Sequence, residues 1–78
     1  MTPETIQALI VAGIPDCQVE VQGDGSHFDA VVVSDAFAGL SLVKKQQLVY
    51  GTLGDRIATG EIHALSIKTF TRDEYEAN

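Results

Sequence analysis

Two strand patterns separated by a short turn sequence constrain the fold of this chain more than any other feature. Residues 17–22 alternate strictly between apolar and polar side chains, which is the pattern of a half-buried strand. Residues 28–33 form a nearly continuous apolar run, which indicates a more central strand. Because residues 23–26 read Gly-Asp-Gly-Ser, all of them turn formers, we expect a β-hairpin here. Cys17 is then expected to pack as a small hydrophobic side chain.

A third strand is expected over residues 61–70, where β-forming side chains follow a glycine and precede a helix start. With a period of two, His63 shares a face with Leu65 and Ile67. The pattern therefore places an imidazole at the rim of an otherwise apolar face.

Helices are expected around these strands. Thr2-Pro3-Glu4 combines a capping hydroxyl, an N-terminal proline and an acid, and the helix that it opens ends near Gly13. Ser41 caps a second helix that is expected to run to about Ala58, although the two glycines at 51 and 54 weaken it. Thr71 begins a short last helix in which Tyr75 is expected to be buried.

The predicted order is α-β-β-α-β-α. It corresponds to an α+β fold in which helices cover one face of a three-stranded sheet. The 78 residues are expected to form a single domain, 1–78.

Length and charge exclude several classes of function. A domain of this size cannot enclose a large catalytic cavity, so we do not expect an enzyme. The formal net charge of −6 opposes general attraction to nucleic acid or to a membrane surface. A single cysteine and the lack of a leader or long apolar run are typical of a cytoplasmic, soluble protein in a reducing compartment.

The two histidines, His27 and His63, are the candidate metal ligands. They are too far apart in sequence to form a local metal motif, and two ligands leave a site incomplete. The remaining ligands would have to come from a partner or from water. Ser26 lies next to His27, but adjacent strand residues point to opposite faces, so no nucleophile–base pair is indicated.

A basic pair, Lys44-Lys45, is the main local feature that could meet phosphate, although two lysines most often form a solvated face. Gly51-Thr52-Leu53-Gly54 matches the G-x-x-G spacing of a KH nucleic-acid loop. That segment contains no basic residue and precedes Asp55, which opposes phosphate binding.

Three segments in fixed order resemble the BolA family, in particular its short bacterial, IbaG-like branch. They are Gly-Asp-Gly-Ser-His-Phe at 23–28, Phe37-x-Gly39-x-Ser41-x-Val43-Lys44-Lys45-Gln46-Gln47-x-Val49-Tyr50, and Ile62-His63-Ala64-x-Ser66-Ile67-Lys68-Thr69-x-Thr71. The likeness covers nearly the whole chain. The fold of that family, similar to a class II KH domain, has the same order of elements as the one expected above.

This resemblance implies a non-enzymatic adaptor in iron–sulfur cluster handling or iron sensing. Its partner would be a monothiol glutaredoxin, with which it would share a two-iron two-sulfur cluster held also by glutathione. The histidine of the I-H-A segment, here His63, would bind one iron. The second ligand would come from the hairpin loop, where His27 is the candidate and Asp24 the alternative. The chain alone would bind no cluster.

The same resemblance leaves a second function open, that of a DNA-binding transcriptional regulator with a KH-like surface. Lys44, Lys45, Gln46 and Gln47, with Lys68, would then meet phosphate. Some relatives carry arginine where this chain has Leu42, so one basic contact is missing. A homodimer that pairs through an exposed sheet edge is a third possibility.

Overall fold

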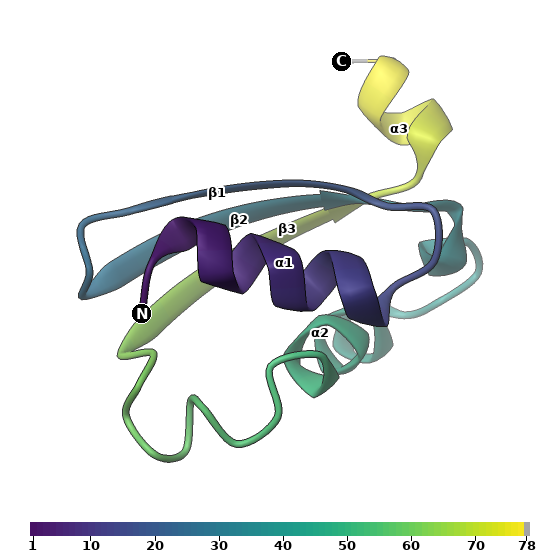
Figure 1. Ribbon diagram of the computed structural model, residues 1–78. Helices are drawn as coiled ribbons and strands as arrows, with labels where there is room; N and C mark the ends of the chain where they lie inside the picture. Colours follow the sequence, from purple (N-terminus) through teal and green to yellow (C-terminus); the bar gives the residue numbers. More distant parts are fainter. Residues whose placement is uncertain (78) are drawn as a thin grey trace.

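The computed structural model describes residues 1–77, which form three α-helices, one short 3-10 helix and three strands (Figure 1). In chain order they are α1 Pro3–Gly13, β1 Gln18–Gly23, β2 His27–Val33, the 3-10 helix η1 Asp35–Phe37, α2 Leu42–Gly51, β3 Ala64–Phe70 and α3 Arg72–Glu76. The predicted α+β class and order of elements are confirmed.

The sheet has the order β1-β2-β3 and is mixed. β1 and β2 form the expected antiparallel hairpin, in which Gln18 pairs with Val33 and Gly23 with Phe28. β3 lies parallel to β2 on its other side, so the connection through α2 crosses over the sheet. β2 is therefore the central strand, as its apolar run predicts.

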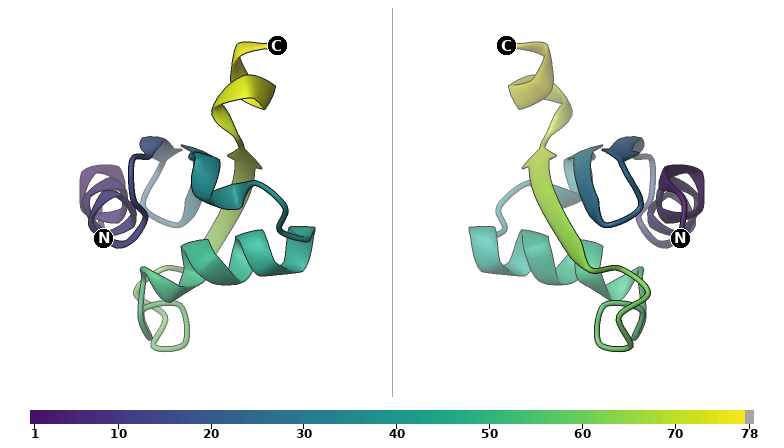
Figure 2. Two further views of the ribbon diagram at one scale, coloured as in Figure 1. Left: turned by 90° about the vertical axis from the view of Figure 1, so that its right-hand side faces the viewer. Right: turned by 90° about the vertical axis from the view of Figure 1, so that its left-hand side faces the viewer.

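One face of the sheet carries the core. Phe28, Ala30 and Val32 of β2 are almost completely buried, and they form one cluster with side chains from α1 and α2. In Figure 1 both of these helices lie below the sheet, whereas α3 lies above it. The prediction that helices cover one face of the sheet is therefore correct for α1 and α2. It does not hold for α3, which extends from the end of β3 on the other side (Figure 2).

The expected helix to Ala58 is wrong, because α2 ends at Gly51 and turns occupy residues 52–60. At its end the Thr52 hydroxyl donates a hydrogen bond to the Val49 carbonyl oxygen at 2.6 Å. Gly54 then adopts a φ of 62°, a left-handed conformation that does not continue a right-handed helix. Leu53 is still fully buried. Leu53 therefore reaches the core from a turn and not from a continuation of α2.

The third strand begins at Ala64 rather than at Glu61. The apolar face expected there is confirmed, since Leu65 and Ile67 pack against the core cluster. His63 lies one residue before the strand, and its side chain is exposed.

All three predicted caps are formed. The hydroxyl oxygens of Thr2, Ser41 and Thr71 accept hydrogen bonds from backbone N–H groups in the first turns of α1, α2 and α3. The expected burial of Tyr75 is wrong, because its exposed fraction is 40% and α3 has no buried residue. Its ring instead contacts Phe70, with centroids 5.8 Å apart.

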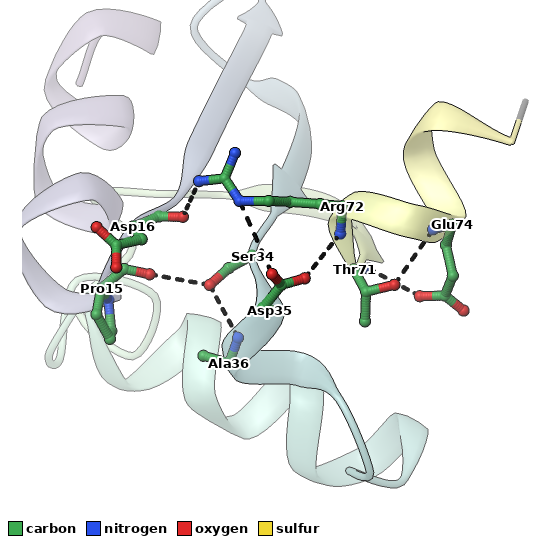
Figure 3. Close-up of polar contacts among 8 residues, drawn as sticks. All are labelled: Pro15, Asp16, Ser34, Asp35, Ala36, Thr71, Arg72 and Glu74. Atoms are coloured by element: carbon green, nitrogen blue, oxygen red, sulfur yellow. Dashed lines mark hydrogen bonds and ion pairs between the residues drawn. The ribbon is translucent and has the colours of Figure 1, made fainter.

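Polar contacts tie α3 to the end of the sheet (Figure 3). The Arg72 guanidinium donates to the Asp16 carbonyl oxygen at 2.8 Å, and the Arg72 N–H donates to the Asp35 carboxylate at 3.1 Å. Neither contact could be expected from sequence spacing. They fix the orientation of a helix that contributes little to the core.

Within residues 1–77, no helix has the length and apolar character needed to cross a membrane.

Candidate functional site

His27 and His63 lie at the same end of the sheet. In the parallel pairing of β2 with β3, His27 is the register partner of Ala64, the residue that follows His63. The Ala64 N–H donates a hydrogen bond to the Ser26 carbonyl oxygen at 3.2 Å. The parallel pairing therefore places two histidines that are distant in the sequence at the same end of the sheet, and both are exposed.

His63 is exposed between two anchored neighbours. On one side Ile62 is only 1% exposed, and its N–H donates to the Arg56 carbonyl oxygen at 3.2 Å. On the other side Ala64 is held to β2 as described. The backbone at His63 is thus fixed while the imidazole stays accessible. The sequence indicated that Ile62 favours a strand, but not that its burial and its hydrogen bond to Arg56 hold the chain next to His63.

The His27 backbone is held by the turn that precedes it. Asp24 Oδ1 accepts hydrogen bonds from the N–H groups of Ser26 and His27, each at 2.9 Å, and the Asp24 N–H donates to the His27 carbonyl oxygen at 3.2 Å. The donors on His27 and Ser26 hold the pKa of the Asp24 carboxyl below its usual range, because they stabilise the charged form. The turn is therefore closed by a side chain as well as by the backbone.

Two glycines permit this turn. A Cβ at Gly23 would collide with the His27 carbonyl oxygen and the Phe28 ring, and Gly25 has a φ of 99°, in the region that favours glycine. Phe28 itself is 1% exposed and starts the buried face of β2. His27 stands on the other side of the strand, with exposed Asp29.

The two imidazoles at this end of the sheet, those of His27 and His63, are suitable ligands for iron, but two ligands do not complete a metal site. Imidazole nitrogen is an established ligand for iron in two-iron two-sulfur clusters. Within residues 1–77, no three histidine, cysteine or acidic side chains are grouped so that they could hold a metal ion. Any metal bound through both histidines would need ligands from another molecule.

Cys17 does not add a ligand at this site. It lies before β1, is half-buried and packs against the core, as expected for a small hydrophobic side chain. Its thiol is 3.9 Å from the Ile10 carbonyl oxygen. Burial raises the pKa of the Cys17 thiol, which disfavours the thiolate that metals and electrophiles require.

The candidate nucleic-acid residues fall into two separate groups. Lys44, Lys45, Gln46 and Gln47 lie together in α2. Lys68 is exposed on β3 in register with Val31, on the face of the sheet opposite to the one that α2 covers. The structure therefore does not bring Lys68 to the lysine pair.

The surface around the lysine pair is largely apolar. Leu42 and Val43 are 67% and 65% exposed, and with Gln46, Gln47 and Tyr50 they line a shallow hollow of about 320 Å³. In the G-x-x-G segment Leu53 is fully buried. This segment is a helix end that packs on the core.

Comparison with known proteins agrees with the fold and with the motifs at this site. The family model described as "BolA-like protein" matches residues 12–74. The chain is 45% identical over 75 residues to the acid stress protein IbaG of Escherichia coli (strain K12), which covers 96% of the chain and 89% of IbaG. It is also 47% identical over 55 residues to a protein of Vibrio cholerae named DNA-binding transcriptional regulator BolA, which covers 70% of the chain and 51% of that protein.

A solved structure of a BolA protein homologue from Coxiella burnetii superposes with a TM-score of 0.86 and 42% identity, covering 97% of both chains. The names of these relatives are those of a stress protein and a regulator rather than of enzymes. The matched region includes the hairpin, α2 and the histidine before β3. On these grounds the chain belongs to the BolA-like protein family.

Proposed function

We propose that this chain is a non-catalytic adaptor that pairs with a monothiol glutaredoxin and shares a two-iron two-sulfur cluster with it. His63 and His27 would be the iron ligands supplied by this chain. The cluster thiolates would come from the glutaredoxin and from glutathione. Such an adaptor would serve in cluster handling or iron sensing.

The observation that carries this proposal is the β2–β3 pairing that sets two exposed histidines at one end of the sheet. Imidazole in place of thiolate raises the reduction potential of a two-iron two-sulfur cluster and makes the ligand titratable. The exposure of both side chains supports access by a partner. The lack of a third ligand within residues 1–77 supports a shared site.

The proposal is tested by mixing the chain with a monothiol glutaredoxin, iron, sulfide and glutathione, and recording the visible spectrum and the species in size-exclusion chromatography. We expect a heterodimer whose spectrum differs from that of the glutaredoxin homodimer. His63→Ala should abolish that difference, because it removes the proposed iron ligand. The His63 side chain is exposed, so the substitution should leave the fold intact. Equal spectra and equal heterodimer yield for wild type and His63→Ala would refute the proposal.

The second candidate function is duplex DNA binding through α2. It is favoured by the name of the Vibrio cholerae relative and by the adjacent Lys44 and Lys45. The apolar side chains of Leu42 and Val43 beside these lysines oppose it, because phosphate contacts depend on cations.

A double variant, Lys44→Glu with Lys45→Glu, separates the two functions. If α2 binds DNA, this variant should weaken duplex binding at low salt in a fluorescence-anisotropy titration, and the wild-type affinity should fall as salt rises. The same variant should leave the cluster spectrum with glutaredoxin intact. His63→Ala should show the reverse pattern, so each variant is the control for the other.

A further inference from the structure

Asp24 closes the turn that leads into His27. Its Oδ1 atom accepts two backbone hydrogen bonds, from Ser26 and His27, both at 2.9 Å. Its own N–H donates to the His27 carbonyl oxygen at 3.2 Å. Three hydrogen bonds of Asp24 therefore join it to His27, the first residue of β2, and to Ser26 just before the strand.

We infer that Asp24 is a positioning residue that fixes the His27 backbone for its role in the shared metal site, and that it does not itself bind iron. This inference rests on the proposed function. One carboxylate oxygen is already used as a double acceptor within the turn. Metal binding through Asp24 would compete with the contacts that hold His27.

The chemistry of the turn explains why this position carries a short carboxylate. Asp and Asn side chains close such turns by accepting hydrogen bonds from backbone N–H groups two and three residues later. The close approach at Gly23 and the φ of 99° at Gly25 both favour glycine on either side of Asp24. The side-chain acceptor then sets where β2, and with it His27, begins.

The positioning role and a ligand role predict opposite results for one conservative change. Asn keeps the Oδ1 acceptor and loses the negative charge. Asp24→Asn should therefore retain the turn and behave as wild type if Asp24 positions His27. If Asp24 were an iron ligand, Asp24→Asn should fail as badly as Asp24→Ala, because a neutral amide replaces the carboxylate.

The measurement is the rate at which the heterodimer cluster spectrum is lost in the presence of a chelator. We expect Asp24→Ala to accelerate loss several-fold and Asp24→Asn to match wild type. In a His27→Ala background, adding Asp24→Ala should give no further acceleration, because Asp24 acts through His27. Asp29→Ala removes an exposed acid from β2 and serves as the charge control, with no change expected.

Amide hydrogen exchange in the free protein provides a readout that needs no cluster. Asp24→Ala should speed exchange at Ser26 and His27 several-fold, whereas Asp24→Asn should not. Failure of the wild type to form a mixed-ligand cluster would refute the proposed function alone, and exchange would then decide the inference. Unchanged exchange in Asp24→Ala, equal cluster loss in the Ala and Asn variants, or additive effects with His27→Ala would overturn it.

Discussion

The Ser34 hydroxyl donates a hydrogen bond to the Pro15 carbonyl oxygen at 2.9 Å, and Ser34 is fully buried (Figure 3). The same oxygen accepts from the Ala36 N–H at 3.1 Å, which caps η1. One side chain thus joins the end of β2 to the loop that follows α1. Within residues 1–77, Ser34 is the one buried polar or charged residue.

Ser34→Ala should lower the free energy of unfolding by about 1–3 kcal/mol, because it removes the hydroxyl that joins the Pro15 carbonyl oxygen and the Ala36 N–H through two part-buried hydrogen bonds. Urea denaturation followed by circular dichroism measures this loss. Ser66→Ala, at an exposed position of β3, is the matched control and should change stability by less than about 0.5 kcal/mol. Equal stability of the two variants would contradict the bridging role of Ser34.

Two leucines near the two ends of α2, Leu42 and Leu53, should respond differently to truncation. Leu53 is fully buried in the core cluster, whereas Leu42 is 67% exposed. Leu53→Ala should cost about 2–5 kcal/mol of unfolding free energy, since it leaves a cavity in the core. Leu42→Ala should be close to neutral in the same denaturation experiment. A large loss at Leu42 would mean that its side chain packs within the domain.

The capping box of α3 predicts an acid-sensitive helix. The Glu74 carboxylate accepts a hydrogen bond from the Thr71 N–H at 2.8 Å, and this contact holds its pKa below the usual range of glutamate. Because the pKa of Glu74 is lower in the folded state, its ionised carboxylate stabilises the folded state at pH values above the pKa of unfolded glutamate. This stabilisation is lost as the pH falls through the pKa of Glu74 in the folded state. The order of α3 should therefore decrease in the acid range.

The titration of Glu74 can be followed by NMR of its side-chain carboxyl carbon. We expect a midpoint below that of the same residue in an unstructured peptide of this segment. Glu74→Gln should keep the cap but remove the pH dependence. A midpoint equal to that of the peptide would contradict the capping contact.

Cys17 should react slowly with iodoacetamide. Burial raises the pKa of its thiol, and the nearby Asp16 carboxylate adds to this effect, so less thiolate is present at neutral pH. The alkylation rate, followed by mass spectrometry, should be lower than that of glutathione at pH 7 and should rise at higher pH than for a free thiol. Urea should remove the difference. Fast alkylation of the folded protein would show that Cys17 is more accessible than the structure indicates.

Local patterns in the sequence were sufficient for much of the fold. The hairpin follows from strict alternation on one side of Gly-Asp-Gly-Ser and an apolar run on the other. The caps at Thr2, Ser41 and Thr71 follow from hydroxyls whose backbone donors lie three residues later. Such contacts form between neighbours in the chain, so sequence spacing reports them directly.

The predictions from sequence were wrong where contacts between distant parts of the chain determine the position of a residue. Leu53 keeps helical spacing but is buried through a turn, and His63 precedes β3 rather than belonging to it. Tyr75 contacts Phe70 at the surface because α3 is directed away from the core, with Arg72 bound to Asp16 and Asp35. Periodicity cannot report a contact between residues that are far apart in sequence.

The sequence by itself determined the order of helices and strands and showed two histidines, each without a local partner. Only the tertiary structure decided that these histidines share one end of the sheet, because the parallel pairing of β2 with β3 is formed through the crossover connection that contains α2. It also decided that Lys68 lies on the face opposite to α2, apart from Lys44. Pairing between distant strands depends on how the helices pack on the sheet, and no local pattern contains that information.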